Sequence, residues 1–185
     1  LPVMNSFFGA SVNAAQGISN QISGQLSVLA GTMLRALNPL IVKSEGAGDR
    51  QFMLKASMIG SKMSFFLLTV IYVPVMIEMP YLFNLWLKHV PEYVVVFCGL
   101  QLIRNLLEQL YITLASSIAA VGNIKKYQLL TSSLTIFPLL IAALLFQLGH
   151  GPVVMYYTFI DYTLISMGIT FYFAHKLCGL HVSEY

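Results

Sequence analysis

Charged residues are scarce in this sequence. Only 9% of the 185 residues are Asp, Glu, Lys or Arg, whereas a soluble domain usually carries about 25%. Because so few charges cannot solvate the surface of a soluble domain, the scarcity excludes a soluble globular enzyme. It also excludes a disordered chain and a nucleic-acid binder, which need a high density of charge. With 57% hydrophobic residues, the composition predicts an integral membrane protein.

Residues that carry chemistry are also few. Cys98 and Cys178 are far apart in the chain and lie in or beside apolar segments, so they are expected to be small apolar residues and not a disulfide or a metal site. The four histidines have no metal-ligand spacing, and no phosphate-binding loop or nucleophile elbow is found. We therefore expect no enzyme, no metal and no cofactor.

A targeting leader is also lacking. The sequence has no initiator methionine, no basic leader segment and no small-residue cleavage site, which argues against a signal peptide. It enters an apolar segment almost directly from Leu1-Pro2. From this start we expect a fragment of a longer protein.

What the sequence does contain is a series of long apolar stretches separated by polar turns. These predict an all-α integral membrane protein, built as a single bundle of about five transmembrane helices. Membrane strands would alternate over about 10 residues, and these runs are too long and uniform for that. Pro74, Pro80 and Pro138 are predicted to kink two of the helices. The predicted spans are about 5–42, 52–87, 92–121, 127–148 and 153–177.

The basic residues predict an orientation. Seven lie at the turns and ends of one side, and Lys88 alone lies on the other. Basic residues accumulate on the cytoplasmic side, so we expect the N-terminus of this segment to be periplasmic and its C-terminus cytoplasmic. The residues on the cytoplasmic side are Lys43, Arg50, Lys55, Lys62, Lys125, Lys126 and Lys176.

The first predicted span is rich in amides. Asn13, Gln16 and Asn20 fall near one face, and Gln21 and Gln25 flank it. Amides are costly against lipid, so they must find polar partners. They could hydrogen-bond across closely packed helices. Alternatively they line a water-filled cavity, which we favour because the amides outnumber what packing requires.

Three charged residues of the predicted spans are also candidates for a cavity. Arg35 either extends its long side chain to the headgroups or faces an anionic substrate. Arg104 and Glu108 lie four residues apart, with Asn105 beside them. They form either an internal ion pair or part of a substrate site, and we favour the site.

Asp161 stands alone inside the last predicted span. It could pair with Arg104, bind a coupling ion, carry a proton or make a structural hydrogen bond. Since ionisable residues inside a membrane are functional candidates, we take Asp161 and Glu108 as candidates for ion or proton coupling.

Several short motifs, taken in order, resemble those of a known family. They are FGASVNAAQGI at 8–18, NPLIVKS at 38–44 followed by GAGD at 46–49, LWL at 85–87 with VPEY at 90–93, and AVGNIK at 120–125. The chain resembles polysaccharide-biosynthesis membrane proteins, the O-antigen-type lipid-linked oligosaccharide flippases of the multidrug and toxin extrusion (MATE-like) superfamily, in the version found in Bacteroides-type bacteria. The likeness runs over essentially the whole chain and matches the C-terminal helical bundle of such a transporter.

This resemblance implies a transporter of the bacterial inner membrane. Such a flippase moves lipid-linked oligosaccharide or polysaccharide precursors, as for lipopolysaccharide, across the membrane by alternating access between two helical bundles. The partners it implies are the lipid-linked glycan, the bilayer and a missing N-terminal helical bundle of the same protein, with no nucleic acid. No residue is carried over from the family as an established ligand.

Two other functions stay open. One is efflux of drugs or organic cations within the same superfamily, which would favour acidic and aromatic residues in the cavity. The other is a non-transporting membrane scaffold for a glycan-synthesis complex. The presence of Arg104 among the cavity candidates favours an anionic head group.

Overall fold

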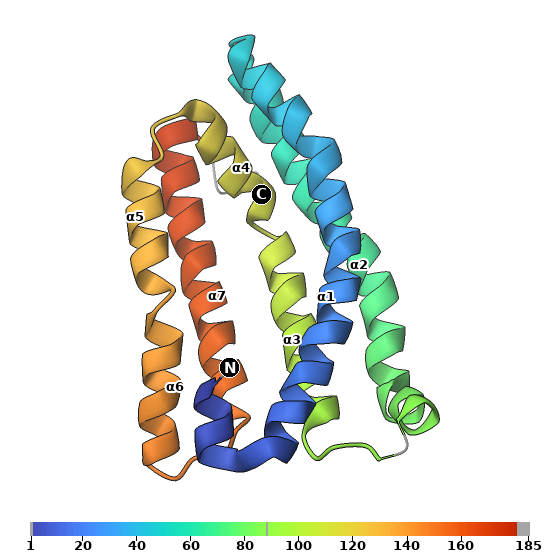
Figure 1. Ribbon diagram of the computed structural model, residues 1–185. Coiled ribbons are helices and arrows are strands. Elements are labelled where there is room, and N and C mark those ends of the chain that lie inside the picture. Colours follow the sequence, from blue (N-terminus) through green and yellow to red (C-terminus); the bar gives the residue numbers. More distant parts are fainter. Residues whose placement is uncertain (1, 88, 181–185) are drawn as a thin grey trace.

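The computed structural model describes residues 2–87 and 89–180, and every regular element within them is helical (Figure 1). The helices are separated by short turns, as the pattern of apolar runs and polar breaks predicts. They are α1 (Pro2–Gly46), α2 (Arg50–Trp86), α3 (Val94–Gln109), α4 (Ile112–Val121), α5 (Lys125–Leu134), α6 (Phe137–Gln147), α7 (Val154–Phe173) and a π-helical turn η1 (Ala174–Cys178).

Three helical segments are long and apolar enough to cross a membrane, judged by length and composition: Ser6–Gly46, Arg50–Trp86 and Lys125–Gln147. They support the prediction of an all-helical membrane protein. The predicted third and fifth spans correspond to α3 with α4 and to α7, which are not among these three. The count of about five spans therefore stays a prediction.

The helices run back and forth between the two ends of a bundle (Figure 1). Helices α1 and α2 form an antiparallel pair, α6 packs on α7, and α3 lies between the two groups in contact with α1, α2 and α7. The turns after α1 and α4 lie at one end. The turns after α2 and α6 lie at the other.

Two separate apolar cores hold the bundle together. The larger one is built from α1, α2, α3, α6 and α7, with Tyr72, Phe97 and Leu102 fully buried. The smaller one joins the end of α1, the start of α2, α4 and η1 around Ile41, Met53 and Ile118. Burial of apolar area inside these cores excludes lipid and gives close packing.

Two of the predicted spans are interrupted. The fourth breaks at residues 135–136, and Pro138 lies in the first turn of α6, where its missing N–H is tolerated. The third breaks at residues 110–111 directly after α3, without any proline. In contrast, α2 continues through both Pro74 and Pro80.

Helix α1 bends sharply at Gly9, whose backbone has φ 80° and ψ −174°. A continuous helix was predicted across this point. The bend lets the first turns fold toward α6, where the rings of Phe7 and Phe8 lie 5.6 and 4.9 Å from that of Phe146. Glycine is required because this backbone region is essentially closed to residues with a Cβ.

Replacing Gly9 by alanine is expected to destabilise the fold by about 1–3 kcal/mol, the usual cost of that backbone region for other residues. A Cβ at this position would meet no atom within 4 Å, so the loss would come from the backbone alone. Gly17→Ala is the matched control: it lies within regular helix, equally free of clashes, and is expected to be neutral or slightly stabilising. Unfolding by SDS in mixed micelles, followed by circular dichroism, measures both; equal stabilities would contradict the prediction.

A seam of small hydroxyl residues joins α2 to α4. The hydroxyls of Ser57 and Ser117 hydrogen-bond to each other, as do those of Ser61 and Thr113. All four side chains are fully buried. Small residues let two helix backbones approach closely, and their hydroxyls satisfy one another where water is absent.

Candidate functional site

A polar cavity of about 180 Å³ lies among α1, α3 and α7. Its arginine and amides come from α1 and α3, and α7 supplies two apolar side chains and a phenol. An arginine and several amides face this one space. The lining residues are Gln16, Asn20, Leu100, Gln101, Arg104, Met155, Tyr156 and Phe159.

Helical spacing brings these side chains together. Gln16 and Asn20 are four residues apart on α1, and Gln101 and Arg104 are three apart on α3. Residues three or four apart share one helix face. Since α1 packs directly on α3, the two polar faces meet.

Arg104 is held from two helices. Its Nη2 donates to the Glu108 carboxylate at 2.7 Å, and its Nε donates to the Thr163 hydroxyl of α7 at 3.3 Å. The guanidinium also lies 5.3 Å from the centroid of the Phe159 ring, within the range of a cation–π interaction. The side chains of Arg104 and Glu108 are 29% and 28% exposed, so the pair is within reach of a ligand or water.

Two amides of α3, one before Arg104 and one directly after it in the sequence, connect α3 to α1. Gln101 donates to the Asn20 side chain at 3.1 Å, and Asn105 donates to the Ser27 hydroxyl at 2.8 Å. Hydrogen bonds of this kind between helices are the usual way to satisfy amides away from water. Asn20 thus both lines the cavity and bonds to α3, and the choice between packing and a water-filled cavity for the amides of the first span stays a prediction.

Two buried polar atoms at the cavity have no hydrogen-bond partner among the described residues: the side-chain oxygen of Gln101 and the hydroxyl of Tyr156. Buried polar groups are normally paired, because an unpaired one costs about 1–3 kcal/mol. Both residues line the same space. A water molecule or the polar group of a ligand in the cavity would satisfy them.

The predicted candidates divide into two groups. Gln16, Asn20 and Arg104 line the cavity, with Asn105 and Glu108 bonded beside it. The others lie elsewhere: Asn13 is half-buried on α1, whereas Gln21, Gln25 and Arg35 are exposed on that helix.

Asp161 is separated from this cluster. It is exposed on α7 and lines a small hollow against Phe137 and Pro138 of α6. Of the two acidic candidates, it is Glu108 that pairs with Arg104. The ion pair with Asp161 that the sequence left open is not formed.

Two cavity residues were missed by the sequence analysis. Gln101 lies three residues before Arg104 and seven before Glu108, so its spacing places it on the same face of α3. That signal was available. Tyr156 carries no comparable signal, because aromatic residues are frequent in every span.

No family model, no curated protein and no solved structure matches this chain. The resemblance to oligosaccharide flippases therefore rests on the sequence motifs alone. The assignment of a function depends on the chemistry of the cavity.

Proposed function

We propose that this chain is part of a flippase, an inner-membrane transporter of lipid-linked oligosaccharide or polysaccharide precursors. The observation that carries the proposal is the guanidinium of Arg104 in a cavity whose other polar groups are amides and a phenol. A guanidinium suits a phosphate or pyrophosphate. Amides and hydroxyls suit the hydroxyl groups of a sugar.

The arrangement of the helices supports a transmembrane path. With about five spans, the periplasmic N-terminus and the cytoplasmic C-terminus lie on opposite sides. The basic turns after α1 and α4 then both lie in the cytoplasm, and these turns occur at the same end of the bundle (Figure 1). The motifs resembling the flippase family point to the same topology.

In this proposal, Glu108 competes with the substrate for Arg104. A phosphate entering the cavity takes the place of the Glu108 carboxylate on the guanidinium. Protonation of Glu108 weakens the ion pair and favours that exchange, which couples substrate binding to a proton. Asp161, apart from the pair, is a second candidate for coupling.

The cavity is too small to hold a whole lipid-linked oligosaccharide. Ligand pockets usually measure about 300–1,000 Å³, and this cavity of about 180 Å³ holds only one polar group of a larger substrate. In this proposal, a second helical bundle provides the rest of the substrate path outside this cavity.

The test uses the complete reading frame that encodes this sequence, expressed in cells lacking it. Arg104→Gln is expected to lower the surface display of the glycan at least tenfold, with Arg104→Lys in between, because lysine keeps the charge but not the paired N–H groups. Lys126→Gln, a change of the same charge at the exposed start of α5, is the control and is expected to keep display. Membrane levels of each variant are compared by immunoblot.

Three results would contradict the proposal. Normal glycan display in Arg104→Gln would show that the cavity around Arg104 is not needed for transport. Loss of cationic dye efflux with normal glycan display would favour transport of organic cations. Loss of assembly of the glycan-synthesis complex, with unchanged flux of precursor in vesicles, would favour the scaffold.

A further inference from the structure

The cavity among α1, α3 and α7 presents one unpaired acceptor and one unpaired hydroxyl. Gln101 donates through Nε2 to the side chain of Asn20 at 3.1 Å, which leaves its Oε1 as a buried acceptor. The hydroxyl of Tyr156 has no partner among the described residues, and this residue is only 6% exposed. An amide oxygen can only accept a hydrogen bond, whereas a phenol can donate one. A ligand group that satisfies both atoms therefore donates to Gln101 and accepts from Tyr156.

The other lining residues add an apolar surface to these two atoms. Leu100, Met155 and Phe159 line the same space. The ring of Tyr156 stacks on that of Phe97, with 4.6 Å between the ring centroids, so its hydroxyl is held in place. The matching ligand group thus combines one donor, one acceptor and a small apolar part.

The cavity lies directly beside the proposed phosphate site. Gln101 and Arg104 are three residues apart on α3, which is about 4.5 Å along the helix axis. Glu108, the ion-pair partner of Arg104, is not among the residues that line the cavity. A phosphate that takes the place of this carboxylate therefore leaves the cavity to a neighbouring group of the same ligand.

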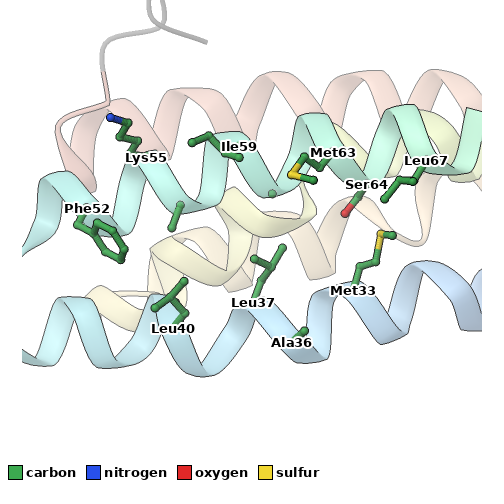
Figure 2. A pocket seen from close by; sticks show the side chains of 12 residues that line it. Met33, Ala36, Leu37, Leu40, Phe52, Lys55, Ile59, Met63, Ser64 and Leu67 are labelled. Carbon is green, nitrogen blue, oxygen red and sulfur yellow. The ribbon is translucent and has the colours of Figure 1, made fainter.

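The groove between α1 and α2 does not offer this chemistry, although it is larger, at about 490 Å³. Figure 2 shows Met33, Leu37 and Leu40 extending from α1 toward α2. Lys55 and Ser64 carry the only polar side chains of its described lining, and none of its lining residues holds a buried polar atom that lacks a partner. A polar group of a ligand is therefore matched by the cavity beside Arg104 and not by this groove.

We propose that the cavity binds the acetamido group of an amino sugar whose phosphate lies on Arg104. The acetamido N–H donates to Oε1 of Gln101, the hydroxyl of Tyr156 donates to the acetamido oxygen, and the methyl group contacts the apolar lining residues. In a 2-acetamido sugar 1-phosphate the two groups are carried by neighbouring ring carbons, which agrees with one helical turn between Gln101 and Arg104. The inference rests on the proposed function, and it specifies an N-acetylated sugar next to the phosphate of the precursor.

Two soluble probes that differ in this one group test the proposal. They are N-acetylglucosamine 1-phosphate and glucose 1-phosphate, each titrated by calorimetry into the complete protein in detergent micelles. We expect the N-acetylated probe to bind about tenfold more tightly, because it makes two additional hydrogen bonds. The ratio of the two dissociation constants is the readout, since a change at the phosphate site affects both probes alike.

Variants of the two unpaired groups separate them from the rest of the site. Tyr156→Phe keeps the stacked ring and removes only the hydroxyl, so the ratio is expected to fall from about ten to about three. Tyr157→Phe is the same change at a neighbouring tyrosine that is exposed, and it is expected to keep the ratio. Gln101→Leu removes the acceptor and is expected to lower the ratio, whereas Gln101→Glu retains an acceptor and preserves it. Circular dichroism verifies that each variant is folded.

Two outcomes would overturn the acetamido site alone. Equal binding of both probes would assign the two unpaired atoms to water, and an unchanged ratio in Tyr156→Phe would place the acetamido group elsewhere. The phosphate site is tested separately by Arg104→Gln, which is expected to weaken the binding of both probes at least tenfold. Binding of neither probe to the original protein would contradict the acetamido site and the proposed function together.

Discussion

Arg104→Met is expected to destabilise the folded protein by about 1–3 kcal/mol, because the carboxylate of Glu108 would lose its partner. Removing one member of a buried ion pair usually costs about 3–5 kcal/mol, and partial exposure of this pair lowers that figure. Loss of the hydrogen bond to Thr163 and of the contact with Phe159 adds to the effect. Glu108→Met is expected to do the same in reverse, leaving the guanidinium uncompensated.

The double variant, Arg104→Met with Glu108→Met, is expected to recover most of that stability. Two apolar side chains of similar volume can replace an ion pair without net cost. A coupling energy of about 0.5–3 kcal/mol between the two sites, obtained from SDS titrations of all four proteins, would measure the pair. Additive losses would mean that the two residues act separately.

The same double variant separates structure from function. A purely structural pair would leave transport intact once stability is restored. The proposed site predicts the opposite: the double variant folds, reaches the membrane and displays no glycan. A folded double variant with normal display would assign the pair to packing alone.

Ser117→Leu is expected to be the most disruptive change in the seam between α2 and α4, with a loss of about 1–3 kcal/mol from overpacking. Ser117 is fully buried against Ser57, so there is no space for a larger side chain unless the two helices separate. Ser117→Ala keeps the close approach and loses only the hydrogen bond, at a cost of about 0.6 kcal/mol. The difference between the two variants distinguishes packing from hydrogen bonding.

Ala119→Leu serves as the control for this prediction, because Ala119 is exposed on the same short helix. It is expected to leave stability within about 0.5 kcal/mol. Unfolding in SDS, followed by helical circular dichroism, gives all three values. If Ser117→Leu and Ala119→Leu were equally mild, the seam would not be closely packed.

The helical class was predictable because apolar runs of this length with so little charge leave a membrane helix as the only arrangement that satisfies the backbone. The positions of the turns followed from glycine, proline and charge. The bend at Gly9 was not predictable, since an isolated glycine within a helical pattern is common and only tertiary contact with α6 reveals its use. The break after Gln109 has no glycine or proline at all.

For the site, the sequence predicted which residues share a face of one helix. It did not predict which faces of different helices meet. The pairing of Arg104 with Glu108 follows from their spacing of four residues on one helix, and the structure contains this ion pair. Whether Arg104 would meet Asp161 depends on the rotation of α7, which the weak periodicity of that helix does not define. The amide-rich first span shows the same limit: only the rotation of α1 decides that Gln16 is buried and Gln21 exposed.

The separation of the apolar interior into two cores affects how the bundle can deform. The break between α3 and α4 lies between the larger core and the smaller one. Each end is therefore expected to unfold as its own cooperative unit. The break between α3 and α4 makes the connection between the two units flexible, whereas one continuous helix would be rigid. Backbone amides in α4 and η1 can consequently exchange with solvent hydrogen independently of those in α3, so that one end of the bundle can loosen while the other stays packed.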